Sequence, residues 1–142
     1  MKSILFISSD GFPSKANPTY GIFTYEQAKA VDNYQVALVD LQTNSSYQIY
    51  KDKFNNLTIH RLLYTKYNPI KSIKNFLYLK KLQKAIMPSL IICSFLNLRN
   101  VLYTLFTNIK KVIIIHGSDA IVKNPFKKII FKKFLSNNFK IF

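Results

Sequence analysis

The sequence predicts an α/β domain with a mostly parallel, Rossmann-like sheet and helices on both of its faces. Short apolar runs of strand length alternate with longer, turn-bounded segments along the 142 residues. Such alternation is typical of parallel strands joined by right-handed crossovers. The chain is 49% hydrophobic and 15% aromatic, which favours a globular domain over a disordered chain. We therefore interpret residues 1–142 as a single domain.

The beginning of the chain predicts a strand, a long loop and a helix. The apolar run Ile4–Ile7 stops at Ser8–Gly11, and a turn-rich loop continues to Gly21, where the helix Ile22–Ala30 begins. Loops between strand and helix usually have about two to six residues, so the extra length suggests a role. Gly21 would let the backbone approach a bound group, and the N–H groups of a helix start favour an anion. A long loop without a ligand explains the pattern equally well.

Two further strands are predicted in the first half of the chain. The continuous apolar run Gln35–Leu41 is typical of a strand covered on both faces, as in parallel sheets. The polar segment Gln42–Asn56 is predicted to be a loop. The β-rich, partly alternating segment Leu57–Tyr64 is predicted to be a strand nearer a sheet edge. His60, which has Arg61 beside it in this segment, is interpreted as a surface or edge residue, because no other chemical group converges on it.

The middle of the chain predicts a long helix that begins at Asn68-Pro69 and ends at Pro88. An apolar stripe recurs at roughly helical spacing and is expected to face the core: Ile70, Ile73, Leu77 and Ile86, with Phe76 and Leu82 beside them. Lysines fill the remaining positions: Lys71, Lys74, Lys80, Lys81 and Lys84.

The second half of the chain continues the alternation. Strands are predicted at Leu90–Cys93 and Lys111–Ile115, and the start of another at Phe139–Phe142. Helices are predicted at Arg99–Thr107 and Phe126–Leu135.

The charge of the chain suggests anionic partners. The formal net charge is +15, from 21 Lys and Arg against 6 Asp and Glu. Nucleic acid, anionic lipid or a phosphorylated ligand would fit this charge, but a genome rich in AT codons would also produce many Lys, Asn and Ile residues. No nucleic-acid-binding motif occurs, so nucleic acid is not expected. The lysine-rich helices could contact an anionic membrane surface peripherally. A solvated lysine face is favoured for the first of them, and both alternatives are open for the second.

Cysteine usage and the absence of a secretory signal predict a cytoplasmic location. Cys93 is the single cysteine, fits a reducing compartment, and is expected to be a small buried apolar group. The apolar run after Lys2 is too short for a signal sequence. The apolar stretch Ala85–Ile109 contains Pro88, Asn97 and Arg99, which a bilayer centre would disfavour.

A candidate site follows the strand Lys111–Ile115. Ligands of open parallel sheets gather at the carboxyl ends of strands, and His116-Gly117-Ser118-Asp119 stands at one of them. His116 can donate or accept a hydrogen bond, Gly117 allows a sharp turn, and Asp119 could orient His116, cap the next helix or bind a hydroxyl. A structural histidine followed by a helix cap is an equally good interpretation.

Several other kinds of site are poorly supported. One Cys and two distant His residues provide no metal-ligand spacing. The phosphate-binding patterns G-x-x-x-x-G-K-[ST] and G-x-G-x-x-G are absent, as is the G-x-S-x-G pattern of serine hydrolases. No cofactor and no metal are therefore expected.

Three segments together resemble the N-terminal domain of glycosyltransferase family 4. The first is Ser8–Pro13 followed by Gly21–Ala30, the second is Met87–Ile92, and the third is the strand that ends in His116–Asp119. In the second segment, Ser89 replaces the family's acid, and Cys93 or Ser94 replaces its histidine. The resemblance covers nearly the whole chain.

The resemblance implies the GT-B arrangement, in which two Rossmann-like domains face one another across a cleft. It implies metal-independent, retaining transfer from a nucleotide-sugar to a glycan or lipid-linked acceptor. By position in the family, Gly21, with Gly117 and Ser118, would lie near the donor diphosphate. His116 would contact the donor sugar. Asp119 would support His116 or the acceptor, and Asp10 and Gly11 would belong to the acceptor-side loop.

The resemblance also implies a second domain with most of the nucleotide contacts, and nothing in the 142 residues matches it. We expect a truncated domain that is inactive alone, from an enzyme of surface polysaccharide biosynthesis, cytoplasmic or at the inner face of the cytoplasmic membrane. The alternative is a small basic module that binds phosphate-bearing ligands or anionic membranes without catalysis.

Overall fold

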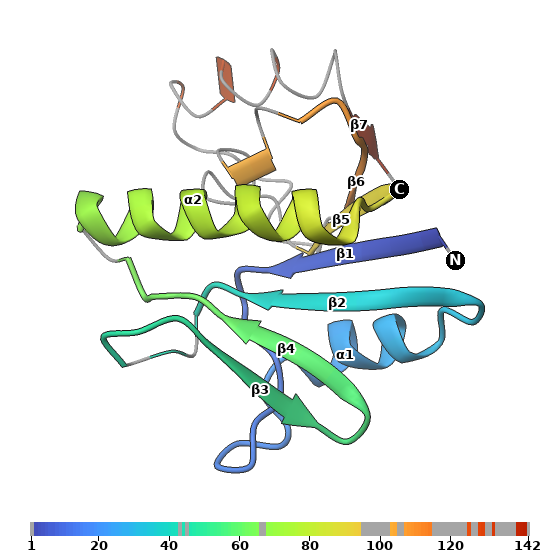
Figure 1. Cartoon of the computed structure of the whole chain (residues 1–142). Helices are drawn as coiled ribbons and strands as arrows, with labels where there is room; N and C mark the ends of the chain where they lie inside the picture. Colours follow the sequence, from blue (N-terminus) through green and yellow to red (C-terminus); the bar gives the residue numbers. More distant parts are fainter. Residues whose placement is uncertain are drawn as a thin grey trace.

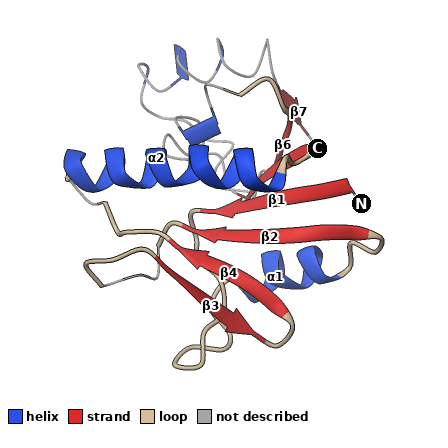
Figure 2. Cartoon of the chain, in the orientation of Figure 1, coloured by secondary structure: helices blue, strands red, loops and turns tan. Residues whose placement is uncertain are grey.

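The computed structural model of the chain describes residues 2–42, 44, 46–65, 68–94, 103–104, 107–114, 125, 128–129, 132 and 139–141. Within these residues, seven strands form one sheet in the order β3-β4-β2-β1-β5-β6-β7 (Figures 1 and 2). The strands are β1 Lys2–Ser8, β2 Tyr34–Asp40, β3 Tyr50–Phe54, β4 Leu57–Arg61, β5 Leu90–Ser94, β6 Lys110–Ile114 and β7 Phe139–Ile141. The helices α1 Ile22–Lys29 and α2 Pro69–Ile86 lie within the described residues.

The sheet is parallel except at one edge. β1 lies in its middle and pairs in parallel with β2 on one side and β5 on the other. β4, β6 and β7 extend the parallel pairing, and β3 alone runs antiparallel, beside β4. Parallel pairing requires crossover segments, which the sequence supplies between the apolar runs. The predicted fold class, a mostly parallel Rossmann-like sheet, is confirmed.

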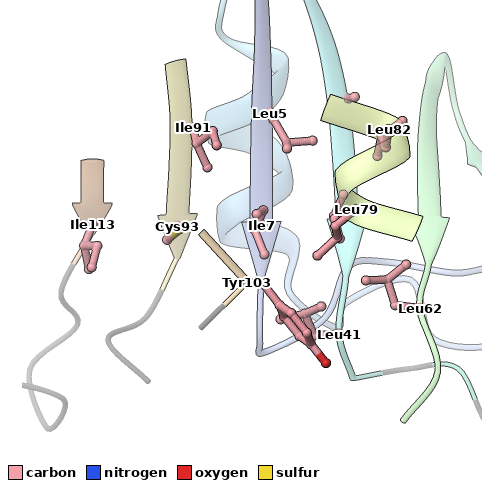
Figure 3. Packing of buried hydrophobic residues seen from close by; sticks show 12 residues of the cluster. Leu5, Ile7, Leu41, Leu62, Leu79, Leu82, Ile91, Cys93, Tyr103 and Ile113 are labelled. Atoms are coloured by element: carbon pink, nitrogen blue, oxygen red, sulfur yellow. The ribbon is translucent and has the colours of Figure 1, made fainter. Parts of the chain in front are cut away.

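The two helices pack on opposite faces of the sheet because the side chains of β1 alternate. Leu5 and Ile7 point to the face covered by Leu79 and Leu82 of α2 (Figure 3). Ile4 and Phe6 point to the other face, where they pack with Tyr25 and Ala28 of α1. Residues of both sets on β1 are at most 5% exposed, so this strand is buried on both sides as its continuous apolar sequence requires.

The ends of α2 match the local sequence signals. The Asn68 side chain accepts a hydrogen bond from the backbone N–H of Lys71 at 3.0 Å, and Pro69 occupies the first turn. At the other end, Met87 takes a left-handed conformation with φ 43° just before Pro88. The predicted bounds of this helix are therefore confirmed.

The side of α2 that faces the sheet differs in part from the prediction. The buried residues are Asn75, Leu79, Leu82 and Gln83. Of the predicted stripe, Leu82 is buried and Phe76 and Ile86 are partly buried against the core, whereas Ile70, Ile73 and Leu77 are exposed. Asn75 can be buried because its side chain exchanges two hydrogen bonds with the backbone of Leu63, at 2.9 and 2.7 Å. These bonds dock the helix by the side opposite to Ile70, Ile73 and Leu77.

The segment predicted as a loop over Gln42–Asn56 contains strand β3. β3 and β4 form a hairpin whose turn is Asn55-Asn56, with Asn55 at φ 50°. Asparagine tolerates this left-handed conformation, so the two residues permit a tight reversal. β4 consequently lies one strand in from the edge. The helices predicted at Arg99–Thr107 and Phe126–Leu135 fall mostly outside the described residues.

The interior confirms one prediction about single residues and corrects another. Cys93 is fully buried, as expected, and burial raises the pKa of its thiol to about 12. His60 was interpreted as a surface or edge residue, but only 5% of it is exposed. Its Nδ1 lies 2.7 Å from the Tyr78 hydroxyl on α2. Burial, with the Lys51 ammonium on β3, lowers the pKa of His60 to about 4.

Among the described residues, no helix is long and apolar enough to cross a bilayer.

The lowered pKa of His60 predicts a pH dependence of stability. Between pH 6.5 and about 4 the unfolded chain binds a proton on His60 that the folded chain does not. The free energy of unfolding should therefore fall as pH drops through this window, by at most about 1.4 kcal/mol per pH unit from this group. Urea titrations of wild type and His60→Gln across the window check this, since the variant should show a shallower fall. Identical pH profiles would contradict the prediction.

Candidate functional site

The carboxyl ends of four parallel strands meet in one row of polar residues, which we call the strand-end row. The strand register pairs Arg61 with Asp40, Asp40 with Ser8, and Ser8 with Ser94. All four are buried, none being more than 1% exposed. Polar groups at this depth need partners, so the row must be satisfied by neighbouring groups.

Arg61 stands at the β4 end of this row. Its Nη1 forms an ion pair with Asp40 and donates to the Phe12 carbonyl at 2.9 Å. Its Nη2 donates to the Pro13 carbonyl and to Asp52 Oδ2, the latter at 2.9 Å. A planar guanidinium suits this arrangement because it presents several donors in fixed directions. Arg61 therefore ties β2 and β3 to the loop that follows β1.

Asp40 also binds the loop that follows β1. Its Oδ2 accepts a hydrogen bond from the Phe12 N–H at 3.3 Å, and its Oδ1 accepts one from the Gln42 N–H at 2.7 Å. Phe12 is thus fixed through its N–H by Asp40 and through its carbonyl by Arg61. Sequence reasoning singled out neither Arg61 nor Asp40 as a site residue. The signal available in the sequence was an Asp and an Arg near the carboxyl ends of two predicted strands.

Gly21 and Gly11 bring the two ends of the β1–α1 loop together. Gly21 has φ 61°, and a Cβ placed on it would lie 2.3 Å from the Gly11 carbonyl oxygen. No side chain fits at that distance, so glycine is required here. The close approach in the structure is to the chain's own backbone. The predicted contact of Gly21 with a donor diphosphate stays a prediction.

Asp10 and Tyr20 flank this loop at the same edge. Asp10 is exposed, and its backbone N–H donates to Ser8 Oγ at 3.2 Å. Partial burial and the carboxylates of Asp10 and Asp40 raise the pKa of Tyr20. A tyrosine hydroxyl is protonated at neutral pH even without such a shift. A carboxylate and a phenol are both suited to hydrogen bonds with sugar hydroxyls. Sequence reasoning identified Asp10 but missed Tyr20, which lies in a turn-rich segment without a distinctive pattern.

A buried hydrogen bond attaches α1 to the strand-end row. Thr24 Oγ1, in the first turn of α1, lies 2.8 Å from Ser94 Oγ at the end of β5. Both residues are buried. The start of α1 is thereby held over the carboxyl end of the sheet, beside the loop that Arg61 and Asp40 fix.

Residues 16–142 match the family described as glycosyl transferase 4-like. The chain belongs to this family. Among solved structures, a sucrose-phosphate synthase from Thermosynechococcus elongatus is similar, with a TM-score of 0.61 and 12% identity. The alignment covers 97% of this chain and 41% of that one, so the chain spans less than half of the synthase, and the likeness concerns the fold. No curated protein matches the chain.

Four of the predicted site residues of this glycosyl transferase 4-like domain cannot be placed. His116, Gly117, Ser118 and Asp119 lie outside the described residues. The strand before them, β6, ends at Ile114 and runs parallel to β5, so its carboxyl end belongs to the same edge of the sheet. The roles of these four residues stay predictions.

The described part of the chain has no cluster of metal-ligating side chains. In that part of the chain, His, Cys, Asp and Glu do not gather in groups of three or more that could hold a metal ion. Asp40 and Asp52 both form ion pairs with the Arg61 guanidinium, which therefore offsets part of the charge of the two carboxylates.

Replacing Arg61 by Met should destabilise the domain strongly. The change leaves Asp40 buried without its ion-pair partner, and removing one partner of a buried pair costs about 3–5 kcal/mol. Urea denaturation measures this as a lower free energy of unfolding. The control is Lys29→Gln, which breaks the exposed 3.0 Å pair with Glu26 and should cost less than about 1 kcal/mol. Similar losses in the two variants would show that the buried pair has no special role.

Proposed function

We propose that this glycosyl transferase 4-like chain is the N-terminal, acceptor-side domain of a retaining glycosyltransferase. It would serve transfer of a sugar from a nucleotide-sugar to a glycan or lipid-linked acceptor in surface polysaccharide biosynthesis. The observation that carries the proposal is the family match over residues 16–142, on a fold whose strand ends form a polar edge.

The β1–α1 loop, at the carboxyl edge of the sheet, has polar side chains that can form hydrogen bonds with an acceptor sugar. The exposed Asp10 carboxylate can accept a hydrogen bond from a sugar hydroxyl, and the protonated Tyr20 hydroxyl can donate one. Gly11 belongs to the same loop, whose backbone Arg61 and Asp40 hold in place. A fixed loop favours binding because little conformational entropy is lost when the acceptor is engaged.

The donor side of the proposal rests on the resemblance. His116 would contact the donor sugar, Asp119 would support it, and Gly21, Gly117 and Ser118 would lie near the diphosphate. Transfer would proceed without a metal ion. In a two-domain cleft the transition state is stabilised by groups on both walls, so we propose that the 142-residue chain alone transfers no sugar.

The second candidate function is a basic module that binds phosphate-bearing ligands without catalysis. The net charge of +15 favours it. Such a module should recognise phosphate itself and be indifferent to the sugar. The two functions therefore differ in which part of a ligand they recognise.

NMR titration of the ¹⁵N-labelled chain distinguishes the two. Maltose, UDP-glucose and inorganic phosphate serve as probes for the acceptor, the donor and the phosphate alone. We expect maltose to shift the amide signals of Asp10, Gly11 and Tyr20, and Asp10→Asn to weaken this binding about tenfold, because the hydrogen bond to a charged group is lost. Mass spectrometry of the chain mixed with maltose and UDP-glucose should show no transfer product.

The matched control is Asp32→Asn, an exposed acid in the turn before β2, at the opposite end of the sheet. It should bind maltose like the wild type. Shifts produced equally by UDP-glucose and phosphate, with none from maltose, would refute the acceptor role and favour the basic module. A transfer product would refute the expectation that this chain alone is inactive.

A further inference from the structure

The side of α2 that faces away from the sheet is partly apolar. Ile70, Ile73 and Leu77 are spaced by three and four residues, and so lie along one line of the helix. They are 66%, 59% and 61% exposed. Helices on α/β sheets normally bury such a line, but here Leu79 and Leu82 occupy the sheet side. Adjacent exposed apolar side chains of this size are typical of an interaction surface.

The same outward side is strongly basic. Lys74, Lys81 and Lys84 are exposed beside the apolar line. No Asp or Glu occurs between Asp52 and Asp119, so α2 has no acid to balance these charges. A basic helix with an apolar line on its exposed side is the pattern of helices that lie on a membrane surface.

An aromatic residue from another segment extends this surface. Tyr47, in the connection between β2 and β3, is 88% exposed. It lines an open groove of about 580 Å³ together with Leu77, Lys74 and Lys81 of α2. The Lys71 ammonium lies 5.6 Å from the centre of its ring. Tyrosine is enriched at membrane–water interfaces, where its ring contacts acyl chains and its hydroxyl stays in water.

We propose that these residues form a docking surface for an anionic lipid bilayer. We call it the α2 outer face, and define it as Ile70, Ile73, Lys74, Leu77, Lys81, Lys84 and Tyr47. The apolar side chains would enter the boundary between headgroups and acyl chains. The lysines would keep their ammonium groups at the level of the lipid phosphates, since their long stems allow this.

The composition of the helix favours lipid over an acidic protein. Protein interfaces are enriched in Arg and depleted in Lys, whereas α2 has five lysines and no arginine. Flexible lysines suit a fluid array of phosphates, which does not require a fixed donor geometry. The inference does not depend on the proposed sugar transfer, because the α2 outer face and the strand-end row use different residues.

Vesicle co-sedimentation of the 142-residue chain tests the proposal. The chain should bind phosphatidylcholine vesicles that contain phosphatidylglycerol, should leave pure phosphatidylcholine vesicles unbound, and should be released by salt. The double variant Ile73→Ser with Leu77→Ser should bind at least about tenfold more weakly, since two apolar side chains no longer enter the lipid. Lys74→Gln with Lys81→Gln should also bind about tenfold more weakly.

The matched control removes the same charge elsewhere. Lys51 and Lys53 are exposed on β3, and Lys51→Gln with Lys53→Gln should keep at least half of the binding. Absence of binding to the anionic vesicles would overturn the proposal. So would equal losses in the two lysine variants, or no loss in the Ile73 and Leu77 variant. Soluble polyglutamate bound with the same dependence on Ile73 and Leu77 would identify an acidic polypeptide as the partner, and the lipid proposal would fail.

Discussion

The buried contact of Arg61 with Asp40 and Asp52 is the interaction on which the carboxyl edge of the sheet depends. A guanidinium without access to water is stable only when its charge and its N–H groups are compensated. Here carboxylates from β2 and β3 balance the charge, and the carbonyls of Phe12 and Pro13 accept the remaining donors. One side chain thus joins two strands to the β1–α1 loop. The position of Asp10 and Gly11, and of the turn that leads to Tyr20, follows from this contact.

Local sequence patterns predicted the parts of the fold that depend on local chemistry. The continuous apolar runs predicted β1 and β2, and Asn68-Pro69 with Pro88 predicted the bounds of α2. The face of α2 was not predictable, because both sides of the helix offer apolar residues. Its choice depends on Asn75, whose two hydrogen bonds to Leu63 exist only in the folded chain. β3 was missed because its sequence, Tyr50–Phe54, is polar and becomes a strand only by pairing with β4.

The sequence predicted where in the fold the candidate site lies, but only some of the residues that form it. The general rule that ligands gather at the ends of parallel strands located the loop after β1. It did not identify Arg61, because burial of an arginine depends on partners that lie far away in the sequence, at Asp40, Asp52 and Phe12. The closeness of Tyr20 to the Asp40 carboxylate is likewise a property of the folded chain. The resulting domain has a polar loop, held by the buried strand-end row, and separately a basic, partly apolar helix face.

Amide hydrogen exchange at Phe12 is the most direct measurement of the role assigned to Arg61. The Phe12 N–H donates to Asp40, which Arg61 holds in place, whereas the N–H of Ile7 belongs to the central strand β1. In Arg61→Met we expect the protection of Phe12 to fall at least about tenfold more than that of Ile7, because the lower global stability affects both amides whereas the opening of the loop affects only Phe12. Equal losses at the two amides, or unchanged protection at Phe12, would contradict the conclusion that Arg61 fixes the loop.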